Sequence, residues 1–159
     1  MLIYTPTITS RLQYITDYCG KEIIGKPFEL TTDRDYYLKS FAEKINYSPE
    51  RISNDKFWIK PHSLLFENKI TEQAVQCFEI KGQKVFFKTE GDFPFDIFAA
   101  SFYLLSRYEE YLPHQKDMYG RYAHENSLAF KEQFLDRPLI NIWLQDLKNI
   151  LRNIFPSLT

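Results

Sequence analysis

The chain has 159 residues, a length typical of one domain. Its 20 Lys and Arg side chains against 21 Asp and Glu side chains give a formal net charge of -1. No long-range positive field therefore attracts a phosphate backbone, and we expect no nucleic-acid partner. The first residues show no basic segment followed by a long apolar one, and no uncharged apolar run could span a bilayer. We expect no membrane association and a cytoplasmic location.

The cysteine and aromatic content indicates the state of the thiols and the kind of core to expect. Cys19 and Cys77 lie in a helix-like and a strand-like segment, and we expect both thiols to be reduced and buried. Aromatic residues make up 17% of the chain, with 14 Phe and 11 Tyr. Most of these rings recur at periodic positions, which favours a core and an interface built from rings. A sugar-binding platform of aromatic faces is the alternative.

The first fifty residues alternate strand and helix patterns. Strand patterns occur at 2–5, 28–31 and 44–47. Thr9 or Ser10 can cap a helix between the first two strands, and Asp33 can cap a shorter helix that runs through Phe41. Because parallel neighbours need crossover segments, this order predicts a small parallel sheet.

The pattern changes after Pro49. Residues 57–60 and 64–66 resemble short strands on either side of Pro61 and His62. Segments 75–80 and 84–88 flank Lys81-Gly82-Gln83, which predicts a hairpin with a tight turn. We expect this half of the chain to be antiparallel.

Two helices are predicted in the last third of the chain. Apolar residues recur at helical spacing within 92–113, and an amphipathic stripe runs over 139–155. Residues 113–138 between them show little periodicity and exceed the usual loop length. The predicted fold class is α/β: an N-terminal β-α-β-α-β parallel unit (Rossmann-like), antiparallel hairpin strands, a long central helix and a C-terminal helix, all in one domain over 1–159.

No complete set of catalytic groups is evident. The five glycines do not form a phosphate-binding fingerprint, and no serine lies in a G-x-S-x-G elbow. His62, His114 and His124 lack the spacing of metal ligands. We therefore predict no catalytic residue, no metal site and no cofactor in this chain.

The long loop carries the one group of residues with functional interest. It combines aromatic, charged and amide groups, which suits a polar ligand site or a docking surface, although a loop pinned to its own domain is the alternative. With two histidines outside this group, the candidate interaction surface comprises Tyr119, Arg121, Tyr122, His124, Glu125, Asn126, His62 and His114.

Several motifs, spread over essentially the whole chain, carry a resemblance. They are FPFDIFAASFYLLSRYEEYLPH at 93–114, YGRY at 119–122, ENSLA at 125–129, FLDRP at 134–138, LTTD at 30–33, INYS at 45–48 and PHSLLF at 61–66. These segments resemble the region upstream of the catalytic domain in Bacteroidetes-type polysaccharide deacetylase-like proteins. The resemblance implies an N-terminal accessory domain whose partner is a C-terminal deacetylase-like domain of the same polypeptide, of the xylanase/chitin deacetylase kind.

That catalytic family removes acyl groups from polysaccharide with a bound metal, held by an Asp-Asp pair and a His-x-x-x-His-type motif. Neither feature is present here, since Thr31-Thr32-Asp33 lacks the adjacent pair and no two histidines lie four apart. The resemblance therefore assigns no catalytic or metal-binding residue to this chain. It places the activity C-terminal to Thr159.

Three functions remain open at this point. The first is a non-catalytic module that packs against the catalytic domain and helps to position or bind polysaccharide. The second is a self-contained hydrolase with a site near His62, His114 and His124. The third is a purely structural cap or protein-interaction domain, which an exposed apolar patch would favour.

Overall fold

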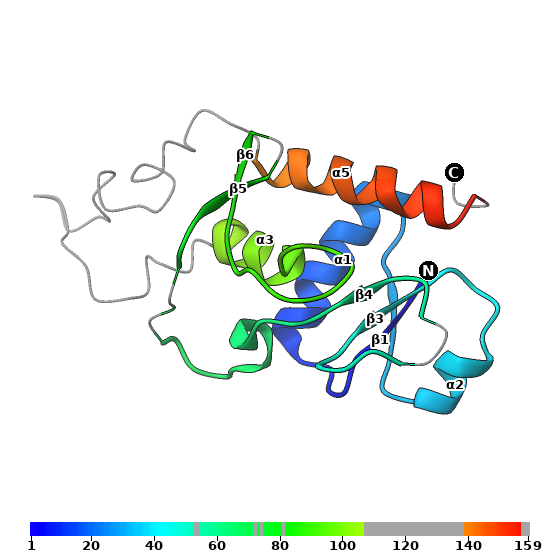
Figure 1. Cartoon of the computed structure of the whole chain (residues 1–159). Helices are drawn as coiled ribbons and strands as arrows, with labels where there is room; N and C mark the ends of the chain where they lie inside the picture. The colour runs from blue at the N-terminus through cyan, green and yellow to red at the C-terminus, as the bar shows by residue number, and fades with distance from the viewer. Residues whose placement is uncertain (53–54, 72, 74, 81, 107–138, 157–159) are drawn as a thin grey trace, which may run out of the picture.

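The structure is a computed structural model, and it describes residues 1–52, 55–71, 73, 75–80, 82–106 and 139–156. The chain folds as a small sheet with helices on both faces and a separate hairpin (Figure 1). The elements in chain order are β1 (Leu2–Tyr4), α1 (Ser10–Ile24), β2 (Glu29–Thr31), α2 (Arg34–Lys39), β3 (Lys44–Tyr47), β4 (Trp58–Ile59), the 3-10 helix η1 (Ser63–Phe66), β5 (Phe78–Ile80), β6 (Gln83–Val85), α3 (Ile97–Leu105) and α5 (Leu139–Ile154).

The main sheet is parallel, with the strand order β2-β1-β3-β4. Ile3 of β1 lies between Leu30 of β2 and Ile45 of β3. The predicted β-α-β-α-β unit and the α/β fold class are therefore confirmed. Side-chain caps begin both helices, because the Thr9 hydroxyl accepts the Leu12 amide in α1 and the Asp33 carboxylate accepts the Tyr36 amide in α2.

Two predictions for residues 57–66 are wrong. The strand predicted at 57–60 is present as β4, but it pairs with β3 in parallel and extends the main sheet, where an antiparallel arrangement was expected. Asp55 fastens the described part of the connection between β3 and β4, accepting hydrogen bonds from the Ile52 amide at 2.8 Å and the Asn46 side chain at 2.7 Å. Residues 64–66 belong to η1, not to a strand. Periodicity cannot distinguish a buried apolar run this short from one helical turn.

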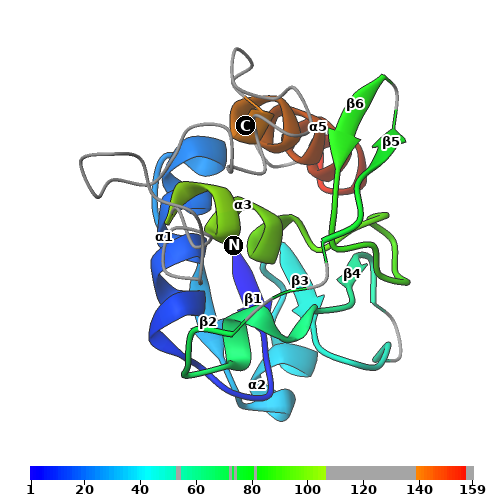
Figure 2. The ribbon, with the colours of Figure 1, turned by 90° about the vertical axis from the view of Figure 1, so that its left-hand side faces the viewer.

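Helices cover the two faces of the sheet unequally. α1 packs against α3 and α5 on one face, whereas α2 contacts β1 and β2 on the other (Figure 2). The larger core lies on the α1 side and includes Ile3, Leu12 and Phe98, each 0% exposed. On the α2 side a small cluster joins Leu2, Tyr37 and Ile52.

The predicted hairpin and C-terminal helix are confirmed. β5 and β6 pair antiparallel around Gly82, whose φ of 79° suits glycine. The hairpin stands beside α5 (Figures 1 and 2), and the Trp143 indole donates a hydrogen bond to the Lys84 carbonyl oxygen at 3.1 Å. α3 begins at Ile97, the first of the residues predicted at helical spacing, and Asp96 caps it. The predicted continuation to Pro113 and the loop 113–138 lie outside the described residues after Ser106.

The cysteine prediction is only partly correct, since Cys19 is buried but Cys77 is half-buried. Burial raises the pKa of the Cys19 thiol well above its usual range, so this thiol stays protonated at neutral pH. None of the helices in the described part of the chain has both the length and the apolar character needed to cross a bilayer.

Gly20 permits the close approach of α1 to the segment that leads into β2. A Cβ at this position would lie 2.6 Å from both the Lys26 carbonyl oxygen and the Phe28 amide nitrogen. We expect Gly20→Ala to lower the free energy of unfolding by about 2 kcal/mol, because the backbone clash outweighs the gain of about 1 kcal/mol in helix propensity. Urea unfolding measures the loss, and a variant as stable as the wild type would contradict the close packing.

Candidate functional site

The strand order places a topological switch point between β1 and β3. The connections leave these two neighbouring strands in opposite directions, toward β2 and toward β4. Open parallel sheets of this kind bind ligands in the crevice at the carboxyl ends of such strands. The first candidate site is therefore the space beyond Tyr4 and Tyr47.

The chain's own residues fill this position. Leu64 and Leu65 of η1 are 0% exposed. The Thr9 hydroxyl donates to the Leu65 carbonyl oxygen, and Arg11 donates to the Leu64 carbonyl oxygen at 2.8 Å. Phe66 stacks on Tyr47 with ring centroids 6.0 Å apart. η1 thus occupies the place where a cofactor would enter a doubly wound sheet.

His62 is the one predicted interaction residue that the structure describes. Its ring stacks on Phe87, with centroids 4.0 Å apart and 20° between the planes. Its Nδ1 accepts a hydrogen bond from the Leu64 amide at 3.2 Å and so caps η1. Partial burial lowers the pKa of the imidazole, which favours the neutral ring at physiological pH. These contacts give His62 a structural role at the start of η1.

The His62 backbone is held by a buried carboxylate. Asp96 is 0% exposed, and its Oδ2 accepts hydrogen bonds from the Tyr47 hydroxyl and from the His62 amide at 2.7 Å. Its Oδ1 accepts the Ala99 amide at 3.0 Å and caps α3. Burial raises the pKa of Asp96 to about 6 despite these donors. The cluster joins β3, η1 and α3 beneath the protein surface.

The buried cluster does not constitute a metal site. In the described ranges, no three His, Cys, Asp or Glu side chains are grouped so that they could hold a metal ion. Residues 107–138 lie outside those ranges, so the convergence of His62 with His114 and His124 stays untested, as do the predictions of no metal and no cofactor.

A cleft opens at the other end of β3, where the chain leaves α2 and where α5 ends. We call it the α2–α5 cleft, and its volume is about 410 Å³. Phe41 is fully exposed and Leu38 is 44% exposed. The residues that line it are Leu38, Ser40, Phe41, Ala42, Glu43, Lys44, Lys56, Ile154, Phe155 and Pro156.

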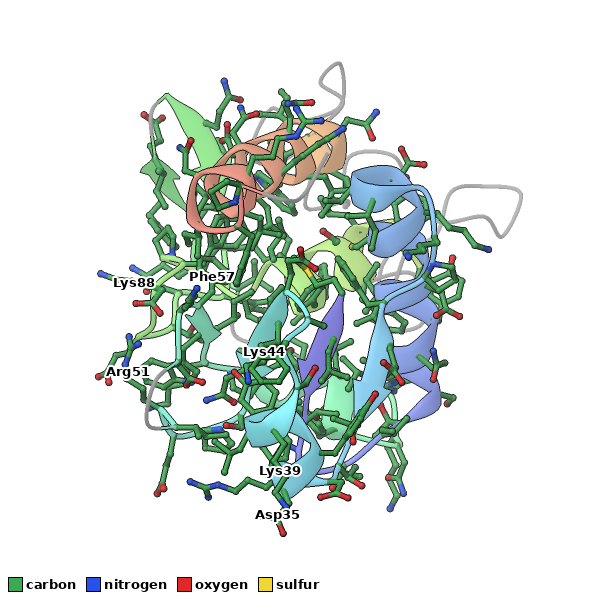
Figure 3. All side chains as sticks on the ribbon, turned by 90° about the vertical axis from the view of Figure 1, so that its right-hand side faces the viewer. Asp35, Lys39, Lys44, Arg51, Phe57 and Lys88 are labelled. Carbon is green, nitrogen blue, oxygen red and sulfur yellow. The ribbon has the colours of Figure 1, made fainter. Side chains whose placement is uncertain are left out.

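Lysine side chains organise the cleft. Lys44 projects from β3 toward the end of α2, whose outer side carries Lys39 and Asp35 (Figure 3). The Lys44 ammonium donates to the carbonyl oxygens of Tyr37 at 2.6 Å and Ser40 at 3.0 Å, and so satisfies the C-terminal end of α2. The Lys56 ammonium lies 5.8 Å from the Phe155 ring centroid. The lining of the cleft therefore combines apolar side chains with two lysines and one carboxylate, that of Glu43.

A smaller cavity lies between the β5–β6 hairpin and α5, and we call it the hairpin cavity. Its volume is about 110 Å³, and its walls combine aromatic and aliphatic groups with one amide and one carboxylate. The residues that line it are Ile80, Gln83, Val85, Phe93, Pro94, Phe95, Trp143, Asp146 and Ile150.

Most of the predicted interaction surface lies outside the described residues. This applies to Tyr119, Arg121, Tyr122, His124, Glu125, Asn126 and His114. The α2–α5 cleft was not predicted from the sequence, because the short helix after Asp33 was expected to run through Phe41. α2 ends at Lys39, two residues before Phe41. Ser40, which can interrupt a helix by bonding to nearby backbone, was the available signal.

Comparison with known proteins gives one match. A family model described as a family of unknown function (DUF7033) matches residues 1–156. The chain belongs to this family. The comparisons with curated proteins and with solved structures find no significant match. The DUF7033 assignment covers the parallel sheet, the hairpin and α5, so the elements described above make up one family unit.

Proposed function

We propose that this DUF7033 chain is a non-catalytic N-terminal accessory domain that packs against a polysaccharide deacetylase-like catalytic domain of the same polypeptide. The observation that carries the proposal is the α2–α5 cleft with its exposed Phe41. The resemblance of the sequence motifs supplies the identity of the partner and the link to polysaccharide, which this domain helps to position or bind.

The chemistry of the cleft suits a protein surface. Phe41 and Leu38 expose apolar area on one side, and Ile154, Phe155 and Pro156 supply apolar wall on the other. A fully exposed phenylalanine beside an apolar hollow is the kind of anchor that contributes most to protein–protein binding. These features favour packing against another domain over stacking on a sugar.

The cleft lies beside the C-terminal end of α5. Pro156 forms part of the wall, and Thr159 follows three residues later, within about 10 Å of chain. A domain that continues from Thr159 would therefore start beside the cleft, and its tether would raise its effective concentration there.

Hydrogen exchange tests the proposal. We expect the amides of 38–44 and 150–156 to exchange more slowly in the full polypeptide than in the 159-residue chain, because the partner excludes water from the cleft. Phe41→Glu should restore fast exchange, since it places a charge at the centre of the interface. Truncating such an anchor to Ala costs about 2 kcal/mol, or roughly 30-fold in docking equilibrium.

Ile70→Glu is the matched control. Ile70 is 46% exposed and does not line the cleft, so this variant should leave the protection unchanged. Two results would refute the proposal: a gene that encodes no domain beyond Thr159, or equal exchange at the cleft in the two forms.

A self-contained hydrolase receives no support from the described residues. The His62 ring stacks on Phe87, and its Nδ1 accepts the Leu64 amide of η1. The structural-cap alternative uses the same cleft. Our proposal differs from it in one expectation: the full polypeptide should lose polysaccharide deacetylation when docking is broken. Deacetylation by the full polypeptide carrying Phe41→Glu distinguishes the two.

A further inference from the structure

We propose that the hairpin cavity is a binding site for a small alkylammonium ion of the size of trimethylammonium. This site is separate from the α2–α5 cleft and does not depend on the proposed docking. It lies where the β5–β6 hairpin meets α5, the contact visible in Figures 1 and 2.

The volume of the cavity limits the ligand to a few heavy atoms. An apolar cavity of about 150 Å³ is known to accept benzene, which has six heavy atoms. In proportion, the volume of about 110 Å³ corresponds to about four heavy atoms, fewer than a six-membered ring contains. Trimethylammonium, a nitrogen with three methyl groups, has this size.

The walls of the cavity suit methyl groups that carry positive charge. Phe93, Phe95 and Trp143 line it, are each at most 3% exposed and pack closely, with the Phe95 and Trp143 ring centroids 5.2 Å apart. Methyl groups on a cationic nitrogen share its charge, and aromatic rings attract such groups. An inorganic cation is disfavoured, because it would have to give up its hydration shell against apolar walls.

Asp146 supplies the opposite charge. Trp143, Asp146 and Ile150 all line the cavity, and their spacing of three and four residues projects their side chains from one face of α5. Asp146 is half-buried and forms neither a hydrogen bond nor an ion pair with the part of the chain that the structure describes. An uncompensated negative charge beside an apolar space favours a cation over a neutral or anionic molecule of the same size.

Lys84 of β6 does not neutralise this charge. Gln83 and Val85 line the cavity, so Lys84, which lies between them, projects from the opposite face of the strand. Its ammonium group lies 3.9 Å from the carboxylate of Glu79, a residue that also lies outside the lining. The charge of Asp146 is therefore available to a ligand.

Three probes with equal numbers of heavy atoms test the size and charge of the ligand: trimethylammonium, acetone and acetate. The chain has two tryptophans, so the Trp143 indole N–H signal can be assigned by comparison with Trp58→Phe and followed by NMR during titration at constant ionic strength. We expect trimethylammonium to shift this signal saturably and to bind more tightly than acetone, with acetate the weakest. Butylammonium represents the end of a lysine side chain. If it bound more tightly than trimethylammonium, the ligand would be a protein segment and the proposal would be overturned.

Asp146→Asn provides the decisive comparison, because it keeps the shape of the side chain and removes its charge. We expect trimethylammonium to bind about fivefold more weakly to this variant, the worth of one partly exposed charge pair, and acetone to bind equally well. Because Asp146 bonds to no other group in the described ranges, the variant should fold, which circular dichroism and the Trp143 signal without ligand establish.

Glu79→Gln is the matched control. It removes the same charge from the hairpin at a residue outside the cavity, so trimethylammonium should bind to it as tightly as to the wild type. Three results would overturn the proposal: no saturable trimethylammonium binding, unchanged affinity in Asp146→Asn, or an equal loss of affinity in Glu79→Gln.

Discussion

Asp96→Ala is expected to lower the free energy of unfolding by about 4 kcal/mol. The substitution removes the acceptor of the Tyr47 hydroxyl, the His62 amide and the Ala99 amide in a place that is 0% exposed. Each buried donor left unpaired costs about 1 to 3 kcal/mol. Because these donors come from β3, η1 and α3, their loss loosens the packing among all three elements.

Urea unfolding of Asp96→Ala and Asp33→Ala measures the effect. Asp33 is also a helix cap, but it is exposed, and its side chain accepts the Tyr36 amide at 3.1 Å, so its loss should cost about 1 kcal/mol. The difference between the two variants isolates the buried network from capping. Tyr47→Phe removes one donor alone and gives an intermediate loss if Asp96→Ala does not fold. Equal losses for the two caps would show that the buried network adds nothing.

The parallel part of the fold was predictable because its signals are local. Thr9 and Asp33 cap their helices in the structure as the sequence predicts, and Lys44–Tyr47 forms a strand with the predicted ends. The direction of β4 was not predictable. The connection that leads into β4 is fastened by Asp55 to Tyr37, Asn46 and Ile52, and hydrogen bonds of this kind leave no periodic pattern in the sequence.

The candidate sites were harder to predict than the fold, for a related reason. Each cavity is built from segments far apart in sequence: the α2–α5 cleft joins Phe41 to Phe155, and the hairpin cavity joins Gln83 to Trp143. The sequence identified Trp143 and Ile150 as part of one apolar stripe but could not show that the stripe is only partly covered. Burial separates them, since Trp143 is 1% exposed and Ile150 is half-buried.

Asp96 likewise illustrates what sequence can and cannot show. Its position before an apolar helix is typical of a cap, a role that the structure confirms. Its bond to Tyr47, 49 residues away, and its complete burial come from tertiary packing. These two properties set its pKa and therefore make the stability of the domain depend on pH.

Stability is expected to fall as pH rises through the titration of Asp96. The pKa of this carboxyl group is about 6 in the folded state, against 3.8 for the ordinary group, because burial disfavours the charged form. Between these values the folded state holds the proton that the unfolded state releases, so the stability that comes from the raised pKa is largest below pH 4 and is lost by about pH 7. The shift corresponds to about 3 kcal/mol.

Asp96→Asn isolates this contribution, because the amide does not titrate and keeps one acceptor oxygen for the helix cap. Urea midpoints from pH 4 to 7.5 should fall in the wild type relative to the variant, and the difference should flatten above the folded-state pKa. Glu67 and His62 have lowered pKa values in the folded state, so their titration stabilises the fold as pH rises. Both groups remain in the variant, so their contributions to the free energy of unfolding cancel in the comparison. Cys19 and Tyr47, which face Asp96, have raised pKa values and stay neutral over this range. Parallel pH profiles for the two proteins would mean that Asp96 is ionised in the folded state throughout. The hydrogen bonds that it accepts would then stabilise the charged form more than burial penalises it.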